Sequence, residues 1–411
     1  MDYFAAKIIF LISSAVLVGC GGSAGCDAAG IAFGGGVSSG CSKSNSNSTP
    51  SVAKGYFIDS PVEGVRYKSG AQSGVTGADG SFIYEEGASI EFYLGGLRLG
   101  SVSNATKYVT PIDLVSGGSI SDDAVINIAA LLLSLDSNQN FSDGIKISSP
   151  TQLAAASWGA SQIDFKQSYA LFSAQAVALT GAALPTKIDV ISHLTTSFRC
   201  LHSGVFVGSW TEVGSVGGIG GYFVNPSDGG VSGAYVANDQ SSSGVLTGTQ
   251  GISMDQRREF VSGNTSSGAT FSGVLSRDGG DLTGTWGNSS RLTSGGFTGR
   301  RLDNSYDGVK YRISGFVQMS APDFLLYIIN VDASGRANGK FYGMRNNVTR
   351  DLSGSLVGAR LSVSTNFGET FVANINLTTG ALSGSTWSGG LLTGTQVRSD
   401  LGGCMLKGFG V

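Results

Sequence analysis

The residues GDLTGTW at positions 280–286 return in near-identical form as GALSGSTW at positions 380–387. Two shorter segments repeat with them: GATF at 268–271 matches GETF at 368–371, and LTSG at 292–295 is matched here with LTGT at 392–395. In both copies short apolar runs alternate with Gly, Ser, Thr and Asn, a pattern typical of strands joined by tight turns. A period of about one hundred residues is one domain rather than one solenoid unit. The sequence therefore predicts two tandem β copies, residues 204–303 and 304–411.

Each copy has room for about eight short strands, which is enough to close an up-and-down barrel. Closure leaves no sheet edge open to aggregation, so it suits a chain with 64 Gly and only 13% charged residues. The two copies would form either separate barrels or one larger barrel or sandwich. The 41% hydrophobic content excludes a disordered chain. We expect a mainly β protein, an antiparallel barrel or sandwich with a helical segment before it.

The recurring Leu-Thr/Ser-Gly strands resemble the barrels of transferrin-binding-protein-type surface lipoproteins, which implies binding of a macromolecule through loops. The GSW segment at 208–210, with Arg300 or Arg301 in the last strand, resembles the Gly-x-Trp and Arg pair of lipocalin-like barrels. That second resemblance implies a small apolar ligand inside the barrel. The second copy departs from it, because it has GF at 315–316 and Arg398 late. The tryptophans of both copies are otherwise expected to be barrel core or to plug the barrel ends: Trp210, Trp286 and Trp387.

Near the N-terminus, an uncharged apolar run follows Lys7 and ends in LVGC at positions 17–20. Its length suits a signal peptide, predicted here as 1–19, and is too short to span a bilayer comfortably. The segment resembles the bacterial lipobox, which implies acylation of Cys20; an ordinary cleaved signal peptide is the alternative. Gly21 rather than Asp follows the cysteine, so the resemblance implies an outer-membrane lipoprotein, facing the periplasm or on the cell surface. Residues 20–52 then form the lipid anchor and a flexible tether rich in Gly, Ser and Asn.

The chain has five cysteines, and assigning Cys20 to lipid leaves an even number in an oxidising compartment. Four cysteines allow three pairings. We favour Cys26–Cys41 in the tether and Cys200–Cys404 around the C-terminal domain; free or differently paired thiols are the alternative.

Residues 53–105 contain short strand-like runs separated by turns. We expect Asp79-Gly80 to turn a tight hairpin, and the alternation of Ile90, Phe92 and Leu94 predicts one buried strand face. This segment resembles the small β-sandwich of proteobacterial surface lipoproteins and, more loosely, carboxypeptidase-regulatory modules. The resemblance implies a spacer or docking module.

Residues 106–203 have helical periodicity. Helices are predicted over 121–135, from Ser149-Pro150 onward, over 164–179 and over 186–201. The last helix has one apolar stripe, expected to be core: Ile188, Ile191, Leu194, Phe198 and Leu201.

The loop after the first helix has oxygen-bearing side chains at the spacing of a calcium loop: Asp136, Asn138 and Asn140, with Asp143 nearby. Phe141 stands where such a loop needs Gly, and no Glu occupies its twelfth position, so a polar loop without metal is the alternative. The two histidines, His193 and His202, are nine residues apart along one helix and are expected to be structural.

The net charge is -3 and no long basic run occurs, so the sequence gives no sign of nucleic-acid binding. No nucleophile motif or phosphate-binding loop suggests an enzyme, and we expect none; nor do we expect a cofactor beyond the lipid and a candidate calcium. The first hypothesis is an anchored extracytoplasmic lipoprotein that binds a protein or glycan or serves as a structural envelope component. The alternative is a carrier of a small hydrophobic ligand inside a lipocalin-like barrel.

Overall fold

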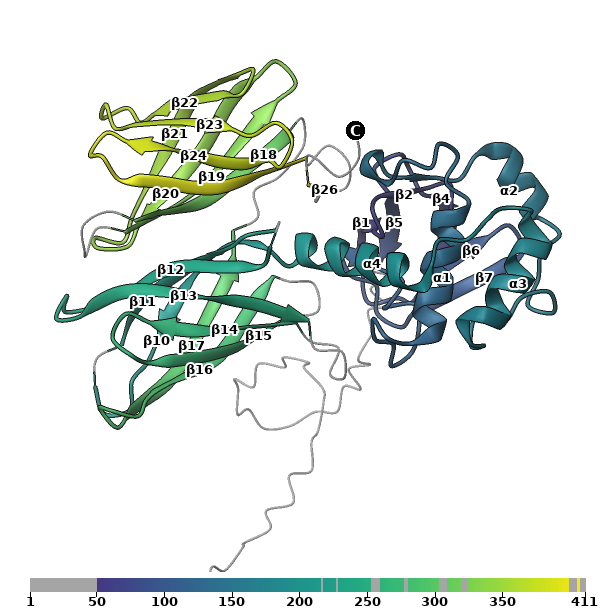
Figure 1. Ribbon diagram of the computed structural model, residues 1–411, viewed down its shortest axis with the longest axis horizontal. Coiled ribbons are helices and arrows are strands. Elements are labelled where there is room, and N and C mark those ends of the chain that lie inside the picture. The colour runs from purple at the N-terminus through teal and green to yellow at the C-terminus, as the bar shows by residue number, and fades with distance from the viewer. Residues whose placement is uncertain are drawn as a thin grey trace, which may run out of the picture. The chain divides into compact units, whose positions relative to one another are not determined.

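The structure, a computed structural model, describes residues 50–411 apart from 216, 227, 253–258, 277–279, 303–308, 319–323, 399–404 and 407–411. The predicted signal peptide, the tether up to residue 49 and four of the five cysteines lie outside the described residues: Cys20, Cys26, Cys41 and Cys404. Cys200 lies in a helix, but its side chain is not described. Lipidation and both disulfides therefore stay predictions. The described chain is mainly β with a helical segment before two C-terminal barrels, as the sequence predicts (Figure 1).

Small sheets and helices share one core in the first part of the chain. The sheet β5-β1-β8 consists of Ser81–Glu85, Val52–Phe57 and Tyr108–Val109. The sheet β4-β3-β6-β7 consists of Gln72–Val75, Arg66–Ser69, Ile90–Leu94 and Leu97–Val102, and β2 (Val62–Glu63) pairs with β9 (Ile145–Lys146). In β6, Ile90, Phe92 and Leu94 are fully buried, which confirms the predicted face.

The Asp79-Gly80 turn does not close a hairpin, contrary to the prediction. Gly80 has the positive φ of 73° that the turn requires. However, β4 before the turn pairs with β3, while β5 after it pairs with β1. The turn therefore moves the chain from one sheet to the other, and a local turn signal cannot distinguish this from a hairpin.

Four α-helices and a short 3-10 turn are described: α1 (Asp123–Ser134), η1 (Phe141–Asp143), α2 (Ser149–Ala155), α3 (Tyr169–Thr180) and α4 (Lys187–Leu201). Helix α1 is buried from Val125 to Ser134, so it forms the centre of this core. The Ser148 side chain, rather than that of Ser149, accepts the capping hydrogen bond of α2 from the Thr151 N–H. Proline then occupies the first turn, where its missing N–H costs nothing.

The apolar stripe of α4 is offset from the prediction. Leu194, Phe198 and Leu201 are buried, but Ile188 is 79% exposed. Val190 is fully buried in its place. The buried face therefore runs through Val190 and Leu194, four residues apart, and Ile188 begins the helix outside that face.

The first barrel is a closed antiparallel cylinder of eight consecutive strands. Its strands are β10 (Gly204–Trp210), β11 (Gly218–Val224), β12 (Gly230–Ala237), β13 (Ser243–Ile252), β14 (Glu259–Thr265), β15 (Thr270–Leu275), β16 (Asp281–Asn288) and β17 (Thr293–Arg301). Pairing of β10 with β17 closes it.

The second barrel repeats this plan, and pairing of β18 with β25 closes it. Its strands are β18 (Val309–Gln318), β19 (Phe324–Asp332), β20 (Arg336–Gly343), β21 (Val348–Val357), β22 (Arg360–Ser364), β23 (Thr370–Ile375), β24 (Ala381–Thr386) and β25 (Leu391–Arg398). A two-residue strand, β26 (Met405–Leu406), adds to β25. The copies thus form two separate barrels, which decides between the predicted alternatives.

The strand registers correct one part of the internal alignment. Gly284 faces Phe297 across β16 and β17, and its counterpart Gly384 faces Leu392. Residues 392–394 therefore correspond to 297–299. The match made from the sequence paired them with residues that begin five positions earlier, at 292. Similar short segments with Thr and Gly occur at both places, so the sequence fits either alignment. The pairing of neighbouring strands decides between them.

Candidate functional site

The first barrel contains a cavity of about 160 Å³ that opens at one end. The open end is formed by turns such as those at Ser242, Ser267 and Arg291, opposite the end where α4 leads into β10. Its wall is mostly aromatic and aliphatic, with hydroxyl groups toward the mouth. The lining includes Trp210, Glu212, Gly220, Tyr222, Tyr235, Phe271, Trp286, Asn288, Arg291 and Phe297.

Glycines occupy inward-facing positions of this barrel, and most of them allow neighbouring strands or aromatic rings to approach closely. They face one another across neighbouring strands in four pairs: Gly208–Gly220, Gly208–Gly299, Gly248–Gly263 and Gly273–Gly284. A Cβ on Gly208 would lie 1.8 Å from the Thr298 carbonyl oxygen, so the backbones approach too closely there for any side chain. Gly220 differs, because its Cβ would meet nothing nearer than Cδ1 of Trp210 at 3.7 Å.

Three aromatic rings form walls at the open end, and the Trp210 ring is perpendicular to the other two. The ring of Trp210 stands at 88° to both Tyr235 and Trp286, with centroids 6.0 and 5.9 Å away. The Trp286 indole N–H donates to the Thr211 carbonyl oxygen at 3.0 Å, which fixes that ring. Such edge-to-face contacts each add about 0.5–1.5 kcal/mol beyond burial, so the walls are held in place without an occupant.

The floor of the cavity is a small apolar cluster that closes the other end of the barrel. Phe206 and Tyr222 stack there with centroids 5.5 Å apart, beside Val231, Val261 and Leu282. Burial raises the pKa of the Tyr222 phenol far above its usual range, so the hydroxyl stays neutral. Its oxygen is buried and has no hydrogen-bond partner among the described residues.

The mouth has one cation and one anion. Neither the Arg291 guanidinium nor the Glu212 carboxylate has an ion-pair or hydrogen-bond partner in the part of the chain that the structure describes. Asn288 has a structural role instead, since its amide donates to the Ser267 carbonyl oxygen and its oxygen accepts from the N–H groups of Ser290 and Arg291. The Asn288 contacts hold the turn that presents Arg291.

The second barrel is filled where the first is hollow. Gly208 faces Gly220 in the first barrel, whereas the equivalent Gly315 faces Tyr327 in the second. The Tyr327 ring is fully buried, and its hydroxyl donates to the Thr393 carbonyl oxygen at 2.7 Å. Val363 and Ala373 likewise stand where the first barrel has Gly263 and Gly273. Sequence reasoning missed this contrast, although a correct alignment of the repeats would have revealed it.

The structure separates the Trp and Arg of the lipocalin-like resemblance. Trp210 pairs with Phe297 at the open end of β10, while Arg301 pairs with Phe206 at the opposite end. The Arg301 guanidinium donates to the Leu201 carbonyl oxygen at the end of α4. Arg300 is exposed, and the Arg398 side chain is not described.

Trp286 and Trp210 line the cavity, whereas Trp387 lies at the end of the second barrel. It is 40% exposed and packs on Phe341 and Phe371 with centroids 6.0 and 5.3 Å away. In the second copy one extra residue precedes this tryptophan, so Thr386 takes the strand position that Trp286 has in the first.

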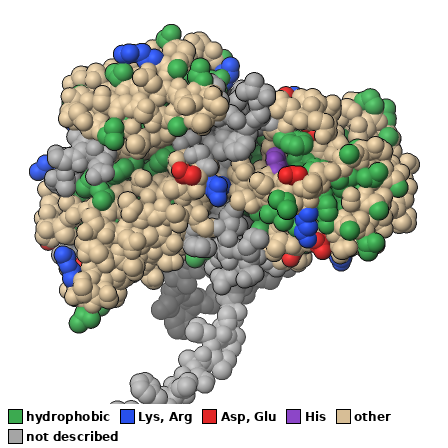
Figure 2. Space-filling model, viewed as in Figure 1, with side chains coloured by type: hydrophobic (Ala, Val, Ile, Leu, Met, Phe, Trp, Pro, Cys, Tyr) green, Lys and Arg blue, Asp and Glu red, His purple; other side chains and the backbone are tan. Residues whose placement is uncertain are grey.

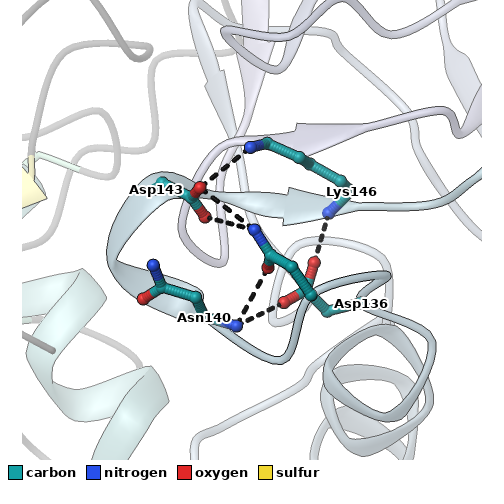
Figure 3. Close-up of polar contacts among 5 residues, drawn as sticks. Asp136, Asn140, Asp143 and Lys146 are labelled. Atoms are coloured by element: carbon teal, nitrogen blue, oxygen red, sulfur yellow. Dashed lines mark hydrogen bonds and ion pairs between the residues drawn. The ribbon is translucent and has the colours of Figure 1, made fainter. Parts of the chain in front are cut away.

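The candidate calcium loop is closed by its own hydrogen bonds (Figure 3). The Asp136 carboxylate accepts from the N–H groups of Asn140 and Lys146, both at 2.9 Å. The Asn138 amide donates to Asp143 at 3.1 Å, and the Lys146 ammonium lies 2.9 Å from the same carboxylate. These contacts favour the alternative of a polar loop without metal, and a calcium titration tests the candidate calcium site directly. No three His, Cys, Asp or Glu side chains within the described ranges gather as a metal site would require.

A buried carboxylate lies next to one of the histidines. Asp59 is fully buried, and its Oδ1 is 3.3 Å from Nε2 of His193 on α4. The same Nε2 lies 3.1 Å from the Asp59 carbonyl oxygen. Burial raises the pKa of Asp59, and His193 acts against that shift. His202 is buried just after α4, where its carbonyl oxygen accepts from Gln250. The two histidines therefore lie in different surroundings.

On the face shown in Figure 2, Lys and Arg side chains are scattered rather than gathered into one continuous patch. None of the helices in the described ranges combines the length and hydropathy of a membrane span.

Comparison with known proteins identifies no family. No family model and no curated protein matches the chain. Kievitone hydratase from Nectria haematococca is 10% identical over 47% of this chain and 87% of its own, with a TM-score of 0.19. A protein of unknown function from the DUF3598 family of Nostoc punctiforme is 10% identical over 49% of this chain and 98% of its own, with a TM-score of 0.12. Neither likeness is close enough to carry an argument.

Proposed function

We propose that this chain is an extracytoplasmic, non-enzymatic binding protein whose first barrel holds a small, mainly apolar ligand. The observation that carries the proposal is the open, aromatic-walled cavity of about 160 Å³. For scale, an engineered apolar cavity of about 150 Å³ in another protein holds benzene. The occupant is therefore of the size of one ring, with any further atoms extending toward the mouth.

The comparison between the two barrels supports the proposal. Strands of the same register surround both interiors, yet Tyr327 fills the second barrel at the position where the first has Gly220. An empty interior costs the dispersion contacts that side chains would otherwise make. The second barrel shows that side chains can fill this space. We therefore explain the space left open in the first barrel by a bound ligand.

The proposed location is the outer membrane, with the chain anchored by lipid on Cys20 and a tether lifting the folded part away from the bilayer. The lipobox-like segment LVGC at 17–20 supports this part of the proposal. A multiply acylated N-terminus would hold the protein stably, whereas one acyl chain would hold it only marginally.

The test is to purify the full chain from membranes, extract it with organic solvent and identify small molecules by mass spectrometry. The proposal expects a compound with one aromatic or apolar ring in stoichiometric amount. Recovery of no ligand, together with failure of the full chain to bind any of the phenyl compounds described below, would remove the carrier proposal.

A macromolecular partner, a protein or a glycan, is the second candidate. It is supported by apolar side chains exposed near one end of the second barrel: Phe367 (69% exposed), Leu391 (63%) and Trp387 (40%). Exposed aromatic side chains of this kind are typical anchors of binding surfaces. Pull-down from envelope extracts with the wild type and Phe367→Ser tests it, and equal recovery of every protein and glycan by both would argue against this surface.

A further inference from the structure

We propose that the ligand of the first barrel bears an acceptor group, best a carboxylate, which the Arg291 guanidinium binds at the mouth. This inference rests on the proposed function and adds the chemical class of the ligand. It depends on the unpaired charge at the mouth and on the position of the aromatic walls.

The first observation is that Arg291 is presented at the mouth without a counter-ion. Asn288 accepts from the Arg291 backbone N–H at 3.2 Å and fixes the turn, but no described residue binds the guanidinium. The second barrel gives the contrast, because its Arg350 lies 3.5 Å from the Glu369 carboxylate and 4.3 Å from the centroid of Phe367. An arginine of this kind, with its planar set of N–H donors, matches the two oxygens of a carboxylate.

The second observation is that the polar atoms of the aromatic walls are out of reach of an occupant. Nε1 of Trp210 and the Tyr222 hydroxyl are buried, and the Trp286 indole donates to the Thr211 carbonyl oxygen. The rings therefore offer an occupant apolar contact, and a charged group of the ligand is left to the mouth, where Arg291 lies.

The Glu212 carboxylate is the one feature that opposes an anion. It lines the same cavity, and perpendicular aromatic walls next to a carboxylate also suit an alkylammonium ion through cation–π contacts. Arg291 would repel such a cation, and its planar N–H donors bind a carboxylate at two points, a geometry that a Glu212–ammonium contact lacks. The balance of groups therefore favours the anion, and an ammonium ligand becomes an outcome of the test.

The test uses three compounds that share one ring and differ only in the terminal group: 3-phenylpropanoate, 3-phenylpropanol and 3-phenylpropylammonium. Their affinities for the full chain are measured by isothermal titration calorimetry and by quenching of tryptophan fluorescence. We expect the carboxylate to bind about tenfold more tightly than the alcohol, and the ammonium compound to bind most weakly, because Arg291 binds the first and repels the last.

Two variants test whether Arg291 and Glu212 set the preference for the carboxylate. Arg291→Gln keeps a side chain of similar polarity without the charge, and should bring the carboxylate to the affinity of the alcohol. Glu212→Gln should strengthen carboxylate binding, since it removes the repulsion. Binding of the ammonium compound in preference, lost in Glu212→Gln, would overturn the inference in favour of a cation site. Equal affinity of all three compounds in the wild type would overturn it and leave the ring-binding cavity intact, whereas failure of all three to bind would count against the proposed function itself.

Discussion

Gly220→Phe fills the cavity of the first barrel with a ring of its own. A Cβ at this position would meet Cδ1 of Trp210 at 3.7 Å and the Ala234 carbonyl oxygen at 4.0 Å, both ordinary van der Waals contacts. The added phenyl ring is the size of benzene, which the volume of about 160 Å³ can hold. The second barrel already has a tyrosine at the equivalent position, so the fold tolerates an aromatic ring there.

The expected effects follow from burial. Burying one phenyl group is worth about 1.5–3 kcal/mol, and losing that site to the protein's own ring should weaken a phenyl ligand by about 10- to 150-fold. The variant should also be more stable, because glycine is unfavourable in a strand and the new ring is partly buried. We expect the free energy of unfolding to rise by about 1–2 kcal/mol. Affinity for 3-phenylpropanoate is measured by calorimetry and stability by urea unfolding of the full chain.

The matched control is Gly287→Phe. Gly287 lies on β16 of the same barrel, next to the inward-facing Trp286, and has no atom within 4 Å of its Cβ position. Its side chain would therefore point away from the cavity, and affinity should stay within about twofold of the wild type. If Gly220→Phe folds and binds the ligand as tightly as the control, the ligand is bound elsewhere and the reasoning is wrong.

Four further predictions concern other parts of the chain. Asp59→Asn removes a buried carboxyl whose pKa is raised, chiefly by burial and against the effect of His193. The folded state therefore keeps this proton to higher pH than the unfolded state does. As the pH rises from the unfolded pKa of Asp59 through the raised folded pKa, the stability of the wild type relative to the variant should fall by at most about 1.4 kcal/mol per pH unit. Urea unfolding between pH 4 and 7 measures this, and a pH-independent difference would contradict it. Tyr327→Phe leaves the Thr393 carbonyl oxygen without its donor at 2.7 Å and should cost about 1–2 kcal/mol of stability, and a cost near zero would show that the hydrogen bond is dispensable. For the loop between α1 and β9, millimolar calcium should move the melting temperature by less than about 1 °C relative to chelator, since a lysine ammonium and backbone N–H groups already satisfy its carboxylates; a larger, saturable rise would establish the calcium site. Cys20→Ser should release the chain from the membrane fraction, and its retention there would argue against lipid anchoring.

The sequence was sufficient to predict the two β copies and the helices before them, because strand periodicity, turn residues and helix caps are local signals. The cavity depends on something else, namely which residues face each other across the barrel. Gly220 is equivalent to Tyr327 only once the register of β10 and β11 is known, and the repeat texture suggested a different alignment near residue 292. Pairing across strands is non-local, so sequence patterns did not reveal the hollow interior.

The charged groups at the mouth were missed for the same reason. Arg291 and Glu212 lie in turns far apart in the sequence, and closure of the barrel brings both to the cavity. The arginines chosen from the sequence, Arg300 and Arg301, belong to the right strand but to the end away from the cavity. The short motif identified strand β17 correctly, but it could not show that the cavity opens at the other end of that strand.

Native mass spectrometry of the full chain, released gently from membranes, tests the ligand-binding barrel most directly. The wild type and Gly287→Phe should carry a bound molecule with a single ring, while Gly220→Phe prepared in the same way should carry none. The same adduct on all three proteins, or no adduct on any of them and no uptake of the phenyl compounds, would contradict a ligand site inside the first barrel.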